Sequence, residues 1–142
     1  TKSKNLSNIA ESYCDAEWPV IAVYDSNIIV LWQDNVLSNW EIRFKMSDDG
    51  GVSWSHNKRL TNTPGYSYCP AVAMDGYNIY VVWYEIFLRN RPDEIYFKKS
   101  EDGGATWTTE NLSVGSYPAI AVNGSNIYVV YSGIYFKKGI LD

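Results

Sequence analysis

The amino-acid sequence predicts an all-β protein made of three sheets of the β-propeller blade type, each with four antiparallel strands. Three observations predict this fold. The chain of 142 residues repeats itself three times. Its apolar segments are short and rich in Val, Ile, Tyr and Trp, and Gly, Asn, Asp or Pro residues separate them. No segment shows the 3.6-residue apolar period that a helix would need.

Each repeat begins with a weak element, D, which is mostly polar with a single leucine and occurs at residues 4–7, 59–61 and 111–113. Element A follows; it starts at a proline and covers residues 19–23, 70–74 and 118–122. Element B starts at an asparagine and covers residues 27–32, 78–83 and 126–131. Because A and B are apolar on both faces, we expect other sheets to cover them on both sides. Trp32 and Trp83 in element B are predicted to lie in the core.

Element C closes each repeat and covers residues 42–45, 95–98 and 134–137. Its side chains alternate, with Ile42 and Phe44 on one face and Arg43 and Lys45 on the other. Tight turns at 25–26, 75–77 and 123–125 join A to B. A sheet that runs from buried A to exposed D matches one propeller blade. The lysine pairs at the ends of element C, 98–99 and 137–138, are predicted to be solvated edge charges.

The most specific motif is a Gly-rich octet that joins C to D. Residues 47–54 read SDDGGVSW, and residues 100–107 read SEDGGATW, 53 positions later. Both match the Asp-box, S-x-D-x-G-x-[ST]-W, so the chain resembles sialidases and other proteins with bacterial neuraminidase repeats. The resemblance implies that each octet is a hairpin turn away from the ligand site, with a structural role for Ser47, Asp49, Gly51, Trp54, Ser100, Asp102, Gly104 and Trp107. No third octet follows residue 138.

Three blades are too few for a closed ring, because propellers have about four or more. We therefore expect residues 1–142 to be one half-propeller, with repeat units at about 1–47, 55–100 and 108–139. Two copies would give six blades, the number in the sialidases that the chain resembles. The N-terminal element at 3–8 would then complete the last blade, 118–138, of the partner copy. The alternatives are a piece of a longer chain and a nine-bladed trimer.

Composition excludes several classes of function. The net charge is −4 and the pI is about 4.9, which argues against a broad surface for nucleic acid or anionic membrane. No apolar run approaches the roughly 20 residues of a membrane helix. His56 is the only histidine, so we expect neither a zinc site nor another cofactor. Cys14 and Cys69 can form one disulfide or remain two thiols. Three Asn-x-Ser sequons slightly favour an extracellular location, and the N-terminus shows no signal peptide.

Candidate ligand-binding residues lie in the loops that join D to A and B to C, because propellers usually bind ligands at the central mouth on that face. These loops are 8–18, 33–41, 62–69, 84–94, 113–117 and 131–134. The candidates for stacking on a sugar or binding its polar groups are Trp18, Trp40, Tyr66, Tyr68, Arg89, Arg91 and Tyr117. The other polar and titratable residues expected there are Tyr13, Asp15, Glu17, Asp34, Glu85, Asp93 and Glu94.

Each candidate also has a simpler interpretation. Trp18 and Tyr117 directly precede a proline, at the repeat position that Cys69 occupies, and a repeated position favours packing. Trp40 has no aromatic counterpart in the other repeats, which leaves ligand binding and packing equally open. Arg89 and Arg91 fit a solvated loop better than an anion site.

Three classes of function stay open: a non-catalytic glycan-binding module, which the sequence favours, a structural or self-assembling propeller, and a glycoside hydrolase. The resemblance to sialidases implies an arginine triad that holds a carboxylate, a Tyr–Glu nucleophile pair and an Asp acid. The chain has only four arginines and no Arg-Ile-Pro motif near the first blade. Arg43 and Arg59 lie on elements C and D, toward the rim. Catalysis is therefore undecided, and a second copy and glycans are the expected partners.

Overall fold

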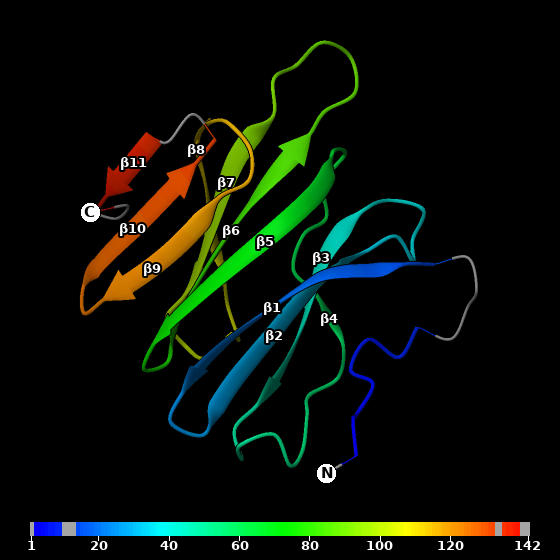
Figure 1. The fold of residues 1–142 in the computed structure, drawn as a ribbon, viewed down its shortest axis with the longest axis vertical. Helices are drawn as coiled ribbons and strands as arrows, with labels where there is room; N and C mark the ends of the chain where they lie inside the picture. The colour runs from blue at the N-terminus through cyan, green and yellow to red at the C-terminus, as the bar shows by residue number, and fades with distance from the viewer. Residues whose placement is uncertain (1, 10–13, 133–134, 140–142) are drawn as a thin grey trace.

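The computed structural model describes residues 2–9, 14–132 and 135–139. These residues form three antiparallel sheets and contain no helix (Figure 1). Blade 1 has the strand order β1 (Ala16–Tyr24), β2 (Asn27–Asp34), β3 (Glu41–Ser47) and β4 (Lys58–Arg59). Blade 2 has the order β5 (Tyr66–Asp75), β6 (Asn78–Ile86), β7 (Glu94–Ser100) and β8 (Thr108–Val114). Blade 3 contains β9 (Ala119–Asn123), β10 (Asn126–Tyr131) and β11 (Tyr135–Lys138). The predicted all-β class is confirmed, with the elements A, B and C in the expected order.

The segment predicted to complete a blade of a second copy is not a strand in the single chain. Residues 2–9 contain no strand, and the carbonyl oxygen of Ser7 accepts a hydrogen bond of 3.4 Å from the Asn57 side chain. This segment therefore touches blade 1 of its own chain. The sheet edge that the prediction assigned to it belongs to a second copy, so its pairing stays a prediction. Blade 3 has three strands within the described part of the chain.

The three sheets stand side by side, with the inner strand β5 between β1 and β9 (Figure 1). Blades 1 and 2 enclose a core made by Ile29, Leu31, Ile42, Phe44, Leu60, Ile79, Val81 and Trp83. Blades 2 and 3 enclose a second core made by Tyr80, Val82, Phe97, Ile127 and Val129. Both predicted core tryptophans, Trp32 and Trp83, are buried. The middle blade is thus covered on both faces, as its apolar strands require.

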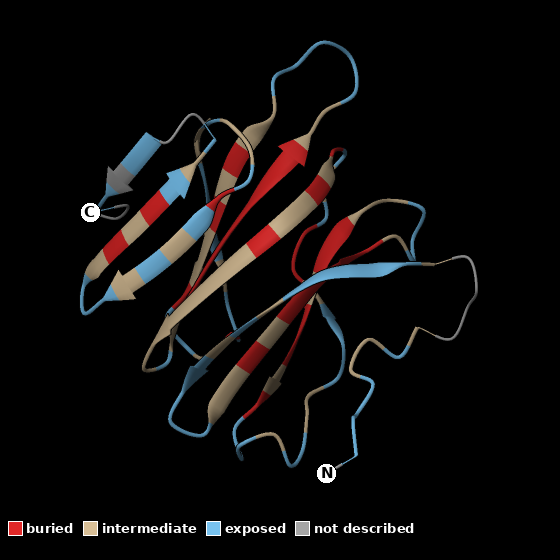
Figure 2. Cartoon of the chain, viewed as in Figure 1, coloured by how far each residue is buried: buried red, intermediate tan, exposed pale blue. Residues whose placement is uncertain are grey.

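The outward faces of the two end blades are not covered. Figure 2 shows β1 as largely exposed, whereas every position of β5 is intermediate or buried and most of β6 is buried. On β1, Ile21 is 62% exposed and Val23 is 56% exposed. Within the described part of the chain, no sheet lies beyond β1 or β9, so each is covered on one side only, and the cover expected from a second copy stays a prediction.

Candidate ligand site at the aromatic end of the blades

The octets form the turns at one end of the blades. Ser47 Oγ donates a hydrogen bond of 2.8 Å to Asp49, and Asp49 accepts bonds from the backbone and hydroxyl of Ser53 at 2.9 and 2.6 Å. Trp54 Nε1 donates to the carbonyl of Gly51 at 3.0 Å. These hydrogen bonds, those from Ser53 foremost, lower the pKa of Asp49 from 3.8 to about 2. All of these contacts lie inside the turn, which is what the predicted structural role requires.

The second octet repeats the contacts of the serine, the aspartate and the second hydroxyl, but Trp107 Nε1, unlike Trp54 Nε1, has no hydrogen-bond partner within the described residues. Asp102 accepts a bond from Ser100 Oγ at 2.8 Å and one from Thr106 Oγ1 at 2.6 Å, and its pKa also falls to about 2, with the Thr106 hydroxyl as the largest cause. Gly104 has a φ of +85°, which favours glycine, and its backbone N–H donates to Ser100. Trp107 packs edge-on against Phe44 at a ring separation of 5.7 Å.

Aromatic side chains gather at the opposite end of the blades. We call Tyr66, Trp40, Tyr68, Tyr84 and Tyr117 the aromatic row. The ring centres are 6.3 Å apart for Tyr66 and Tyr68, 5.6 Å for Trp40 and Tyr68, 6.0 Å for Tyr68 and Tyr84, and 5.2 Å for Tyr84 and Tyr117. The row therefore crosses from blade 1 over blade 2 to the start of blade 3. Four of its five members were predicted as ligand-binding residues, and Tyr84 was not.

A pocket of about 480 Å³ lies beside this row. Its described lining consists of Trp40, Tyr66, Tyr68, Cys14, Asn35, Val36 and Ser38. Its size is within the 300–1,000 Å³ that is usual for small-ligand sites. Aromatic rings with a few polar groups at the rim can hold a small molecule that has one apolar face and several hydroxyls.

The proline positions shape the inner strands at this end. Trp18, Cys69 and Tyr117 each precede a proline and have φ values of 52°, 48° and 52°. This left-handed conformation is unusual for large side chains and for residues before proline. The pairing register shifts at this point in β1 and β5, as in a β-bulge. In the single chain, Trp18 is 57% exposed and Tyr117 is 64% exposed, and Tyr117 packs on one side against Tyr84.

The row consists of one tryptophan and four tyrosines and contains no carboxylate and no basic side chain. Burial raises the pKa of Tyr84, and a hydrogen bond with Tyr117 raises it further. Burial also raises the pKa of Tyr68 and that of the Cys69 thiol. Cys14 and Cys69 are both free thiols, so the structure contains no disulfide between them. The backbone N–H of Cys69 donates to the Gln33 side chain at 2.8 Å.

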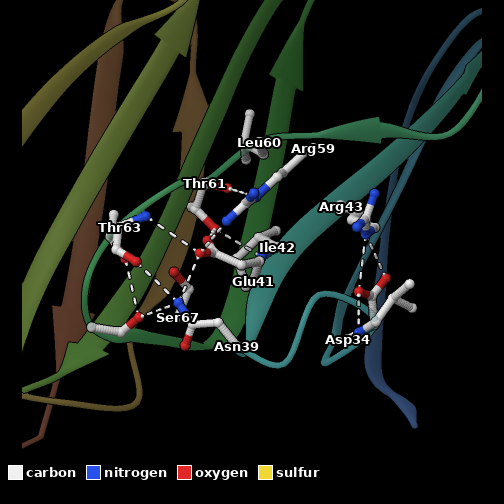
Figure 3. A network of polar contacts seen from close by, with 12 residues as sticks. Asp34, Asn39, Glu41, Ile42, Arg43, Arg59, Leu60, Thr61, Thr63 and Ser67 are labelled. Atoms are coloured by element: carbon white, nitrogen blue, oxygen red, sulfur yellow. Dashed lines mark hydrogen bonds and ion pairs between the residues drawn. The ribbon is translucent and has the colours of Figure 1, made fainter. Parts of the chain in front are cut away.

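Behind the row, Glu41 lies at the centre of a buried polar network (Figure 3). Glu41 accepts a hydrogen bond of 2.6 Å from Arg59 and one of 3.0 Å from the Asn39 side chain. It also accepts one from the Thr61 hydroxyl. Thr63 adds a backbone bond of 3.3 Å. The contacts tie β3 to the loop that leads from β4 to β5.

Glu85 is the second carboxylate of this network and is fully buried. It accepts bonds of 2.7 Å from Ser67, 2.6 Å from Trp83 Nε1 and 2.8 Å from the Thr63 hydroxyl. Desolvation raises the pKa of Glu85, and the charge of Glu41 adds to this, while the three hydrogen bonds oppose it. Because Thr63 and Ser67 flank Tyr66, the network fixes the loop that presents Tyr66 and Tyr68.

Two carboxylates that were expected at the mouth are thus buried. Glu85 is one, and Asp34 is the other; Asp34 accepts bonds of 2.9 Å from Trp32 Nε1 and from Arg43 Nε. Both follow the pattern Trp-x-Asp/Glu, in which the indole N–H reaches the carboxylate two residues later. This repeated pattern is the sequence signal that could have identified them as structural. Glu17 stays exposed, and its carboxylate lies 3.4 Å from Gln33 Nε2.

The arginines of the β6–β7 loop do not line the pocket. Arg91 pairs with Glu94 at 2.9 Å and stacks over the Phe87 ring at 4.0 Å. Arg89 is exposed in the same loop with a φ of 90°. Asp93 accepts a hydrogen bond from Gly115 through its backbone. Tyr13 lies outside the described residues, and Asp15 is held through its backbone by Asn35.

Within the described ranges, no group of three or more His, Cys, Asp or Glu side chains is arranged to hold a metal ion. The same part of the chain has no helix with the length and apolar character to cross a membrane.

Comparisons with known proteins support the fold. No protein-family model and no curated protein sequence matches the chain. Among solved structures, the chain is similar to a family 117 glycoside hydrolase of Zobellia galactanivorans, with 12% identity and a TM-score of 0.59 over 87% of this chain and 50% of that one. It is similar to a GH43_1 enzyme of Xanthomonas citri, with 10% identity and a TM-score of 0.61 over 84% and 40%. It is also similar to a GH93 α-L-arabinofuranosidase of Fusarium graminearum in complex with arabinobiose, with 14% identity and a TM-score of 0.53 over 84% of this chain and 44% of that one.

These neighbours are propeller-like glycoside hydrolases, and at this identity the likeness shows the fold alone. The chain spans half or less of the length of each of these three structures. It therefore has a propeller-type fold.

Proposed function

We propose that the chain is a non-catalytic carbohydrate-binding module whose ligand stacks on Trp40, Tyr66 and Tyr68. The observation that supports this most is the pocket of about 480 Å³ that these three rings line. A sugar ring has an apolar face of C–H groups, and an exposed aromatic ring covers such a face. Asn35 and Ser38 lie at the same pocket and supply hydrogen-bonding groups for hydroxyls.

The likeness to glycoside hydrolases supports a sugar as the ligand class, and one of those structures contains arabinobiose. The two octets, each matching the Asp-box at every fixed position, support a place for the chain among the sialidase-like propellers. Because the row contains no basic side chain that would pair with an anion, we infer a neutral mono- or disaccharide rather than an anionic one.

The chemistry of the pocket favours binding over hydrolysis. Glycoside hydrolysis usually needs two carboxylates on opposite sides of the scissile bond, separated by about 5 to 10 Å. No carboxylate is present among the described residues that line the pocket. Glu41 and Glu85 are buried outside the pocket lining. Their oxygens accept hydrogen bonds from protein groups, Arg59 for Glu41 and Ser67 for Glu85.

The test is binding of neutral mono- and disaccharides, arabinobiose and xylobiose included, measured by calorimetry and tryptophan fluorescence. Trp40→Ala is expected to raise Kd at least about fivefold, because a central aromatic contact typically contributes more than about 1 kcal/mol. Tyr77→Ala is the matched control, since Tyr77 is an exposed aromatic in the β5–β6 turn at the octet end. An unchanged Kd for Trp40→Ala, or a parent protein that binds none of the sugars, would overturn the proposal.

A glycoside hydrolase is the second candidate function, because the similar solved structures are enzymes of that kind. Glu17 is an exposed carboxylate on the inner strand β1 that could act as acid or base. Turnover of a panel of fluorogenic glycosides, lost in Glu17→Gln and retained in Trp40→Ala, would favour this candidate over a binding module.

A further inference from the structure

We propose that the outward faces of blades 1 and 3 are the two halves of one blade–blade interface, and that a second copy of this chain closes the ring through it. The first outer face consists of Ile21, Val23, Ile28 and Val30 on β1 and β2. The second outer face consists of Ala119, Ala121, Tyr128, Val130 and Phe136 on β9, β10 and β11. Alternation along the strands directs these side chains away from the two observed cores.

The first outer face has the same chemistry as two faces that are already packed. By repeat position, its residues correspond to Val72, Met74, Ile79 and Val81, which pack against blade 1. They also correspond to Ile120, Val122, Ile127 and Val129, which pack against blade 2. In blade 1 the corresponding side chains have no described sheet packed against them, and Ile21 is 62% exposed.

The second outer face matches the opposite side of the same interfaces. Its residues correspond to Val20, Ala22, Ile29, Leu31 and Phe44, which pack against blade 2. In blade 2 the corresponding Ala71, Tyr80, Val82 and Phe97 pack against blade 3. In blade 3, Val130 is 42% exposed and Phe136 is 63% exposed. Each outer face therefore carries the side chains that the other one meets elsewhere in the molecule.

The match is between two different faces, so the contact is head-to-tail. Head-to-tail contacts form closed rings when the rotation per copy divides a full turn. The two faces lie on opposite sides of the three sheets (Figure 1). With three blades per copy, two copies give six blades, within the usual four to eight, and three copies give nine. A dimer is thus the assembly that the blade number selects.

The N-terminal segment provides an independent argument. In each repeat, the outer strand of one blade directly precedes the inner strand of the next, and its leucine enters the core between them, as Leu60 and Leu112 do. Residues 3–8 hold the corresponding position before β1, with Leu6 in place of those leucines. We infer that this segment pairs with the free edge of β11 in the second copy. The ring also places two aromatic rows around one mouth, whether or not a sugar binds there.

The test uses the full chain and light scattering coupled to size exclusion. The parent is expected at twice the chain mass of 16.2 kDa. Ile21→Lys and Val130→Asp are each expected to give folded monomers, because both side chains are exposed in the single chain, and circular dichroism checks the fold. Leu6→Asp is expected to weaken the dimer by a smaller factor. Leu88→Asp is the control, since Leu88 is exposed in the β6–β7 loop outside both faces, and it stays dimeric.

Mixing the Ile21→Lys and Val130→Asp variants tests the head-to-tail geometry. In an equimolar mixture, one interface pairs the introduced lysine of the first variant with the introduced aspartate of the second. The other interface pairs two unaltered faces, so a dimer returns although neither variant dimerises alone. A same-face dimer predicts instead that one variant stays dimeric by itself: Val130→Asp if the first outer face pairs with itself, and Ile21→Lys if the second does. That result, a parent that remains a monomer, or a parent at three times the chain mass would overturn the proposal.

Discussion

The side-chain contacts at the octet end of the blades are repeated between blades, whereas those at the aromatic end differ. At the octet end, both turns form the same serine–aspartate and hydroxyl–aspartate contacts: the Ser–Asp bond measures 2.8 Å in each copy, and the bond from the second hydroxyl, of Ser53 or Thr106, measures 2.6 Å. At the aromatic end, equivalent residues take different partners. Glu41 binds Arg59 from the next element, whereas its repeat counterpart Glu94 binds Tyr96, Arg91 and Asn111.

The difference shows which end is framework and which end has diverged. The octet contacts join residues two to four positions apart, so each turn forms independently of its surroundings. The contacts of Glu41 reach about twenty residues along the chain and depend on neighbouring elements. A locally closed turn can be repeated without change, and this leaves the other end free to vary.

The largest expected effect comes from removing Glu41. Glu41→Ala removes the carboxylate that pairs with Arg59 and leaves several buried hydrogen-bond donors without an acceptor. We therefore expect a loss of about 3 to 5 kcal/mol in the free energy of unfolding. The matched variant Glu94→Ala removes the equivalent residue from a partly exposed site and is expected to cost about 1 kcal/mol or less. Urea denaturation compares the two. Equal losses would show that the two positions are not different in kind.

A second expected effect concerns acid stability at the octet end. The pKa of Asp49 and that of Asp102 fall to about 2 in the folded state, from 3.8. Lowered carboxyl pKa values stabilise the fold above pH 4, and this contribution is lost as pH falls toward 2.

The double variant Asp49→Asn with Asp102→Asn is therefore expected to be less stable than the parent at pH 6 and to lose less stability between pH 4 and pH 2. Thermal unfolding across that range measures both quantities. Parallel pH profiles for parent and variant would contradict this interpretation.

The smallest expected effect has the opposite sign and lies at the aromatic end. Burial raises the pKa of Glu85 in the folded state. Folding therefore loses stability as pH rises from the ordinary carboxyl pKa to the raised one, because the buried carboxyl must ionise. This stability returns as pH falls back through the raised pKa. Glu85→Gln retains an acceptor for Trp83 Nε1 and has no such charge. We expect its stability relative to the parent to rise from pH 4 to pH 8, as followed by urea denaturation. A relative stability that falls over this range would refute the sign.

Local and repeated features were predictable from the sequence, and contacts between distant elements were not. The octet turns follow from residues within eight positions, and the order of the strands follows from the three-fold repetition. The Trp-x-Asp/Glu pairs were just as local but were assigned to the mouth as free carboxylates. No local pattern joins Glu41, Thr63 and Glu85, because 22 residues separate each acid from the threonine.

The aromatic site was predicted as a set of residues but not as an arrangement. Trp40 stands in a loop of blade 1, while Tyr66 and Tyr68 open blade 2, and only the packing of the two blades brings the three rings to one pocket. The N-terminal strand is the opposite case, because its residues match a repeat element while its predicted partner lies outside a single chain.

The residues before the three prolines have a practical consequence for protein engineering. Trp18, Cys69 and Tyr117 share a positive φ although two are large aromatic residues and the third is a small thiol, so the scaffold accepts side chains of different size and chemistry there. Asn, Asp and His adopt a positive φ more readily than most residues, and glycine does so freely. A library confined to these three codons would vary the inner rim of all three blades while leaving strand register, octets and cores unchanged.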